Sequence, residues 1–217
     1  MGLFDTLMGR TKPVKANLDA LFALPSAAVT LQVSAGLVST EKAGVCFKPP
    51  SGQNFADMQG ELEKLLELGD ATGSAAGGDA TGTAAAASTL TVRHVGDRFG
   101  YRWILVEGGG IDDLVTRVHM VHSSLEDAGW GPQLLCSVFG FAPAAADPDI
   151  GDRPDAVNRP IFLVYLAKQG TFYPFAPTGN ERRDTELEMR LRGVLGTDLP
   201  VETDLSRWFP LWDLPVS

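Results

Sequence analysis

Apolar side chains alternate with polar ones, or form short runs bounded by turn residues, in several segments, and this pattern predicts strands. The segments are residues 28–34, 44–48, 90–95, 101–107, 133–141, 161–168 and 171–176. A short turn between Gly96 and Gly100 joins two of them and predicts a hairpin. Pro174 lacks a backbone N–H group, which places the last strand at a sheet edge or at a bulge.

Apolar residues recur every three to four positions in three other segments, which we predict to be helices. These segments are residues 54–68, 111–128 and 181–195. In the second, Asp112 and Asp113 lie at the N-terminal end, where the helix dipole favours negative charge, and Gly129 follows the last turn.

The predicted elements follow one another as about three strand–strand–helix units. Short turns between consecutive strands favour antiparallel pairing. Helices with one apolar face each would then cover one face of the sheet. The sequence therefore predicts an α+β fold, with an antiparallel sheet and helices packed on one face.

Two segments interrupt this pattern. Residues 69–89 contain Gly, Ala, Thr, Ser and Asp but no aromatic or large aliphatic residue, so we expect a flexible linker or a long surface loop. Residues 142–159 are rich in Pro and Asp and predict an exposed acidic loop. The linker would separate an N-terminal unit, residues 1–68 with short N-terminal helices, from a main α+β unit at 90–217. One continuous domain is the alternative, because the first unit alone would be marginally stable.

The charge and the cysteine content exclude several classes of protein. The 217 residues carry 18 Lys and Arg against 27 Asp and Glu, a net charge of −9, whereas nucleic-acid binding needs a basic surface. Cys46 and Cys136 lie far apart without metal-ligand spacing, which excludes a disulfide scaffold and suits a reducing cytoplasm. We find no run of about 18 apolar residues and expect no membrane-spanning helix.

The residue patterns of common catalytic sites are absent. The chain has no GxxxxGK[ST] phosphate loop and no GxSxG, HExxH or CxxC motif. His119, His122 and Glu126 fall on one flank of the predicted helix 111–128, a spacing that could hold a metal ion. The polar edge of an amphipathic helix explains the same spacing. We therefore expect no catalytic residue, no metal and no cofactor.

Two aromatic segments are candidates for partner binding. Residues 171–177 read TFYPFAP and residues 204–214 read DLSRWFPLWDL. Trp, Tyr and Arg are enriched at the energetic centres of interfaces. The same side chains would also serve to pack the tail onto the sheet. The candidate residues are Phe172, Tyr173, Phe175, Arg207, Trp208, Phe209 and Trp212.

The N-terminus is a third candidate for binding. Leu3, Phe4 and Leu7 are apolar at helical spacing, and basic residues follow them. Such a segment could form a short amphipathic anchor on a membrane or a partner, or dock on the protein itself. A segment of this length would give at most weak peripheral membrane contact.

Three long blocks of the sequence resemble one known family. The opening MGLFDTLMGR…KPVKANLDALFALPSAAVTL, the middle LEDAGWGPQLLCSVFGF and the ending LVYLAKQGTFYPFAP…RRD…DLPVETDLSRWFPLW are similar to the PspA-associated proteins called PspAB. The resemblance implies a prokaryotic source of actinobacterial type. It also implies a link to PspA, the membrane-associated coiled-coil protein of the phage-shock envelope-stress response. It supplies no catalytic residues.

We therefore expect a non-enzymatic adaptor of the envelope-stress system that acts by protein–protein binding, with PspA or another component of that system as the partner. We expect it in the cytoplasm, with the inner face of the cell membrane as the alternative location. A metal-dependent or small-molecule-processing enzyme that uses His119, His122 and Glu126 is the alternative function.

Overall fold

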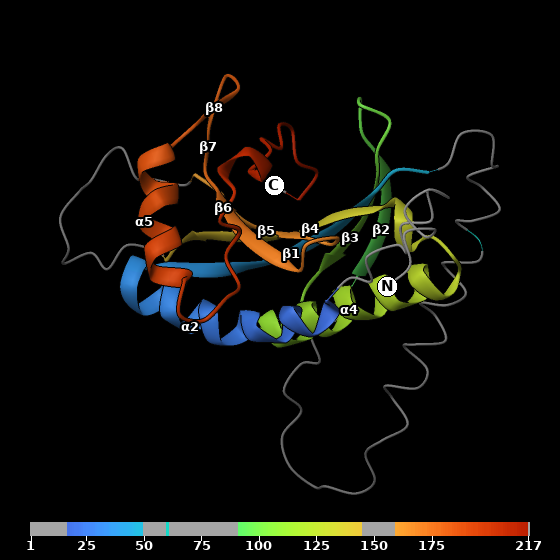
Figure 1. Ribbon diagram of the computed structural model, residues 1–217, viewed down its shortest axis with the longest axis horizontal. Helices are drawn as coiled ribbons and strands as arrows, with labels where there is room; N and C mark the ends of the chain where they lie inside the picture. The colour runs from blue at the N-terminus through green and yellow to red at the C-terminus, as the bar shows by residue number, and fades with distance from the viewer. Residues whose placement is uncertain (1–16, 50–59, 61–90, 145–158, 217) are drawn as a thin grey trace, which may run out of the picture.

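The computed structural model describes residues 17–49, 60, 91–144 and 159–216 (Figure 1). Apart from Gly60, the predicted helix 54–68 lies outside the described residues, as do the linker 69–89 and most of the acidic loop 142–159.

Within the described residues, six strands form one antiparallel sheet in the order β2-β3-β1-β4-β5-β6. The strands are β1 (Leu37–Phe47), β2 (Thr91–Gly96), β3 (Arg102–Glu107), β4 (Leu134–Pro143), β5 (Ile161–Leu166) and β6 (Thr171–Phe175). β1 comes from the predicted N-terminal unit, yet it pairs with β3 and β4 of the predicted main unit. The described parts of the two units therefore share one sheet.

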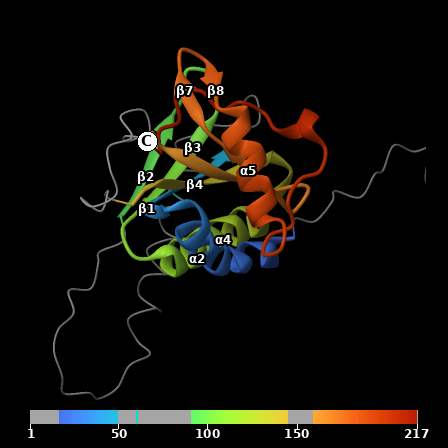
Figure 2. The ribbon, with the colours of Figure 1, turned by 90° about the vertical axis from the view of Figure 1, so that its left-hand side faces the viewer.

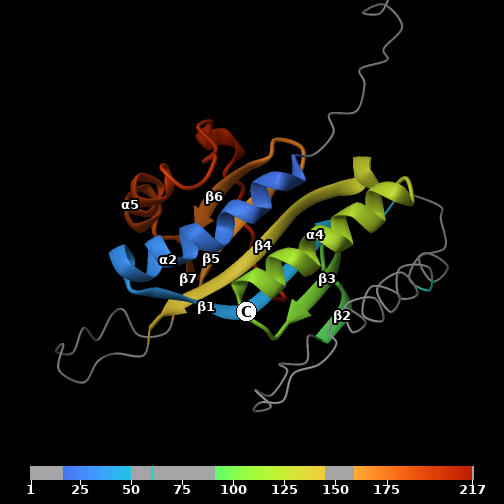
Figure 3. The same ribbon diagram turned by 90° about the horizontal axis from the view of Figure 1, so that it is seen from below.

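Three α-helices accompany the sheet in the described part of the chain: α2 (Leu24–Ala35), α4 (Ile111–Asp127) and α5 (Thr185–Leu195). α2 and α4 lie side by side under one face, and α5 stands beside the edge strand β6 (Figures 2 and 3). The short helix η1 (Leu18–Ala23) precedes α2, and η2 (Gly131–Gln133) leads into β4. The predicted α+β fold class is confirmed.

The opposite face of the sheet is covered by the C-terminal tail, which contains the short helix η3 (Leu205–Arg207) (Figure 1). Two separate apolar clusters therefore bury both faces of the central strands, whereas the edge strand β2 has no buried residue. In β5, for example, Leu163 and Tyr165 pack on the helix side, whereas Phe162 and Val164 pack under the tail. This arrangement explains why every residue of β5 is buried.

The strand predicted at residues 28–34 is wrong, because these residues lie in α2. The β-branched residues of the segment are typical of strands, but its buried Leu24, Ala27 and Leu31 recur at helical spacing. Pro25 occupies the first turn, where its missing N–H group has no helical partner to lose. Gly36 ends the helix with φ of 64°, a left-handed conformation that favours glycine.

The other predicted elements that fall on described residues are present. The hairpin β2–β3 and helix α4 match their predicted ranges to within a residue or two, and the Pro174-containing strand is the edge strand β6. Helix α5 begins four residues later than predicted. The Asp184 side chain accepts a hydrogen bond from Leu187 N at 2.9 Å and caps it, while the preceding residues form the hairpin of β7 (Pro177–Gly179) and β8 (Arg182–Arg183).

The stretch Leu18–Ala35 corrects a further expectation. It has 18 residues with a mean hydropathy of 1.4, and is long and apolar enough to cross a membrane by length and composition. In the fold, Leu21, Leu24 and Leu31 of this stretch pack into the core below the sheet. Core helices pass the same test, so the finding is weak evidence for membrane insertion.

Candidate partner-binding surfaces

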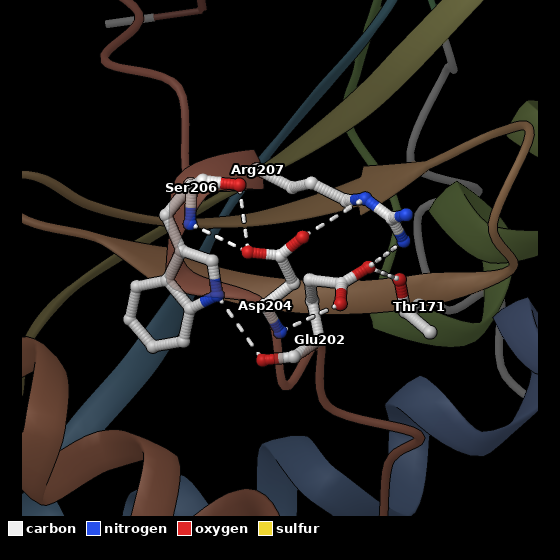
Figure 4. A network of polar contacts seen from close by, with 6 residues as sticks. Thr171, Glu202, Asp204, Ser206 and Arg207 are labelled. Carbon is white, nitrogen blue, oxygen red and sulfur yellow. Dashed lines mark hydrogen bonds and ion pairs between the residues drawn. The ribbon is translucent and has the colours of Figure 1, made fainter.

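A network of polar contacts fastens the C-terminal tail to the edge of the sheet (Figure 4). The Glu202 carboxylate accepts hydrogen bonds from the Thr171 hydroxyl of β6 and from Asp204 N, both at 2.9 Å. The Arg207 guanidinium lies 3.5 Å from the same carboxylate. Burial by itself would raise the pKa of Glu202, but these hydrogen bonds and the Arg207 charge outweigh it and lower the pKa. Glu202 is therefore held as a carboxylate that orders the tail.

Four of the predicted aromatic candidates are buried beneath or beside this tail. Phe172, Tyr173, Phe175 and Trp208 are each at most 5% exposed. Trp208 stacks on Tyr173 with ring centroids 5.7 Å apart, and its indole N–H donates to Glu202 O at 3.1 Å. These side chains pack within the protein, so only the remaining tail candidates are accessible to a partner.

The remaining tail candidates lie at the surface. Phe209 is 58% exposed, the Arg207 side chain is about half exposed, and Trp212 is partly buried against Phe175. The predicted tail patch thus reduces to the exposed Phe209, the half-exposed Arg207 and the partly covered Trp212.

A second apolar surface, which the sequence pattern did not reveal, lies on the outward side of η1 and α2. Phe22, Val29 and Val33 are 52%, 61% and 82% exposed, and the exposed Ser26 completes a row spaced 4, 3 and 4 residues apart. We call these four residues the α2 outer stripe. This spacing is the a/d repeat by which one helix packs against another. The repeat becomes apparent only when residues 28–34 are assigned to a helix, as in the structure, and not to a strand.

The helix that carries the α2 outer stripe has no charge, and the charged side chains beside the stripe are acidic. α2 has no charged residue. A groove of about 460 Å³ runs from Val29 and Gln32 to Ile111, and Glu41 and Asp112 lie along it. The Phe22 ring also packs against His119 of α4, with centroids 4.9 Å apart. An apolar helix with basic flanks would complement this surface.

The comparison with family models gives one match, to PspA associated protein B, over residues 1–216. This chain belongs to the PspA associated protein B family. Neither the comparison with curated proteins nor the comparison with solved structures gives a match. The resemblance that the three sequence blocks indicated is therefore confirmed, and the family name implies an accessory role in association with PspA.

For this member of the PspA associated protein B family, the candidate metal ligands do not form a site. The described residues contain no group of three or more His, Cys, Asp or Glu side chains that could hold a metal ion. His122 is fully buried and its Nε2 lies 2.5 Å from Ser137 Oγ, while His119 packs against Phe22. The helix that contains His119, His122 and Glu126 packs against the sheet and η1.

The N-terminal candidates Leu3, Phe4 and Leu7 lie outside the described residues. Their binding to a partner or a membrane stays a prediction.

Proposed function

We propose that this protein is a non-enzymatic accessory protein that binds PspA directly, and that the α2 outer stripe is the contact surface. The observation that carries the proposal is the family match over residues 1–216, because the name of the family states an association with PspA. Location in the cytoplasm is part of the proposal. The two unpaired cysteines support it, because disulfides form in oxidising compartments and are rare in the cytosol.

The geometry of the stripe supports binding to a helix. A coiled-coil protein such as PspA carries apolar a and d positions along its helices, and an exposed row with 4, 3, 4 spacing can pack against such a helix. The exposed Val29 and Val33 bring no side-chain charge that would have to be desolvated. Glu41 and Asp112 would face the Lys and Arg side chains that commonly flank a coiled-coil seam.

The enzyme alternative has no comparable support. A metal ion needs several converging ligands within about 2.0–2.2 Å. The fully buried His122 instead contacts Ser137 through its Nε2 atom.

The test is a calorimetric titration of the full chain with purified PspA. We expect the double substitution Val29→Glu and Val33→Glu to weaken binding by about 10-fold or more, because it places two carboxylates in the seam. Both side chains are exposed, so the melting temperature should hardly change. Thr116→Glu, at an exposed position of α4, is the matched control for added negative charge.

Each outcome bears on one part of the proposal. Absence of any PspA binding by the wild-type chain would overturn direct association. Equal affinity of the wild-type and stripe variants would overturn the stripe as the contact. In that case Phe209→Ala would test the exposed tail region.

A further inference from the structure

A cavity of about 600 Å³ lies on the sheet face opposite α2 and α4, between the sheet and tail residues 209–214. Its lining is mostly aromatic and aliphatic and includes Tyr101, Trp103 and Trp212. Cys46 and Cys136, which are paired neighbours on β1 and β4, contribute two free thiols. Cavities of several hundred Å³ with apolar walls are typical of small-molecule sites.

The tail closes this cavity through fixed contacts. The Tyr173 hydroxyl donates to Phe209 O at 2.8 Å, and the Phe175 ring meets Trp212 edge to face with centroids 5.4 Å apart. Leu214, further along the tail, is buried against the same cluster. The walls are therefore held in place by the fold itself, which lowers the conformational entropy that a ligand must remove.

The two carboxylates of the lining are already engaged within the protein. Asp97 accepts hydrogen bonds from Phe99 N, Tyr101 N and Trp103 Nε1, each at 2.9 Å. Asp213 forms an ion pair with Arg98 at 2.6 Å. Arg98 offsets the charge of Asp213, whereas Asp97 keeps its negative charge and is held in place by three neutral N–H donors.

Lys168 is the remaining charged group of the lining. It follows β5 in the turn before β6, is exposed at the edge of the cavity, and has no ion-pair partner among the described residues. The neighbouring Gln169, also exposed and in the lining, adds an amide donor. The cavity thus combines an apolar interior with a cation at its edge that pairs with no carboxylate in the described part of the chain.

We propose that this cavity binds an apolar monocarboxylate, with the hydrocarbon body against the aromatic walls and the carboxylate beside Lys168. The apolar lining supplies the affinity through burial of the ligand's hydrocarbon surface. The ammonium group of Lys168 favours a carboxylate over an uncharged alcohol. This site is separate from the α2 outer stripe, which lies on the other side of the sheet.

The test is calorimetry of the full chain with three probes of equal length: decanoate, decanol and decyltrimethylammonium, each below the concentration at which it aggregates. We expect saturable binding of one decanoate per chain and about 5-fold weaker binding of decanol, because a solvent-exposed ion pair contributes about 1 kcal/mol. The ammonium probe should bind more weakly than decanoate, because Lys168 repels its head group. Lys168→Gln should reduce decanoate affinity to the level of decanol, whereas Lys42→Gln, at a position outside the cavity lining, should leave it unchanged.

A second variant tests the location. Leu211→Trp adds volume inside the lining and should weaken all probes by about 10-fold or more. If it lowers the melting temperature markedly, Leu135→Phe, which fills the lining from β4, replaces it. Lack of saturable decanoate binding would overturn the proposal. So would equal affinities for the three probes, or unchanged affinity in the cavity-filling variant.

Discussion

His122 Nε2 lies 2.5 Å from Ser137 Oγ, and both side chains are completely buried where α4 packs against β4. The other ring nitrogen, Nδ1, has no hydrogen-bond partner among the described residues. A protonated imidazole would bring a second N–H donor that finds no acceptor there. Burial, and to a smaller extent the charge of His119, therefore lower the pKa of His122 to about 4.

This contact predicts a loss of stability in mild acid. The pKa of His122 rises to about 6.5 in the unfolded chain, so the unfolded chain binds more protons between pH 6.5 and about 4. The contribution of His122 to stability is therefore complete above that window and falls as the pH drops through it, by about 3 kcal/mol. Urea denaturation at a series of pH values measures this free energy of unfolding.

The variant His122→Gln isolates the effect from that of the titrating carboxylates, because Gln does not titrate. The free energy of unfolding of the wild-type chain minus that of the His122→Gln variant should decrease as the pH falls. His119→Gln removes the nearby charge and should make the decrease slightly smaller. A difference between wild type and His122→Gln that is independent of pH would contradict the prediction.

The buried ion pair of Glu188 and Arg183 predicts a large effect of substitution in α5. Glu188 accepts hydrogen bonds from Arg183 Nε at 2.8 and 2.9 Å and from Ala176 N at 2.9 Å. Arg183 also donates to Trp208 O at 2.8 Å, which ties β8, α5 and the tail together. We expect Glu188→Ala to lower the free energy of unfolding by about 3 kcal/mol or more, because it leaves the guanidinium without its partner.

Glu186→Ala, at an exposed position of the same helix, is the matched control and should change stability by less than about 0.5 kcal/mol. The double variant Arg183→Leu and Glu188→Leu should be more stable than Glu188→Ala, since it leaves no unpaired charge. Equal stabilities of the Glu186 and Glu188 variants would show that the pair does not hold the tail.

Much of the fold could be predicted from the sequence because its signals are local. Pro174 indicated an edge strand through its missing N–H group, and β6 is an edge strand. The apolar face of α4 and the acidic residues at its start indicated its bounds. Helix α2 carries conflicting local signals: Val29, Thr30 and Val33 favour a strand, whereas Pro25 and Gly36 favour the start and the end of a helix.

The candidate surfaces depend on contacts that are distant in sequence, and these could not be predicted. The sequence identifies the aromatic residues of 171–177 and 204–214 as candidates for packing or binding. It does not reveal that the tail covers the second face of the sheet and buries Tyr173 and Trp208. In the same way, the sequence placed His119, His122 and Glu126 on helix α4, but the burial of His122 against Ser137 of β4 could not be predicted from their spacing.

The tail predicts effects of very different size for two neighbouring aromatic residues. Trp208 is buried, stacked on Tyr173 and hydrogen-bonded to Glu202 O, so Trp208→Ala should lower the free energy of unfolding by about 3 kcal/mol or more. Phe209→Ala should change it by less than about 1 kcal/mol, because the ring is 58% exposed. Urea denaturation of both variants measures the two losses of free energy of unfolding. Comparable losses would mean that Phe209 also packs against the protein in solution.

The thiol of Cys46 predicts slow chemical modification of the folded protein. A hydrogen bond with Cys136, together with burial, raises the pKa of Cys46 far above its ordinary value. Since the thiolate is the reactive form, iodoacetamide should alkylate Cys46 in the native chain at least about 10-fold more slowly than in the urea-unfolded chain. Mass spectrometry of the peptide that contains Cys46 measures the rate. Cys136→Ala removes the hydrogen-bond partner and should make Cys46 react faster, whereas equal native rates in the wild type and this variant would contradict the role of Cys136.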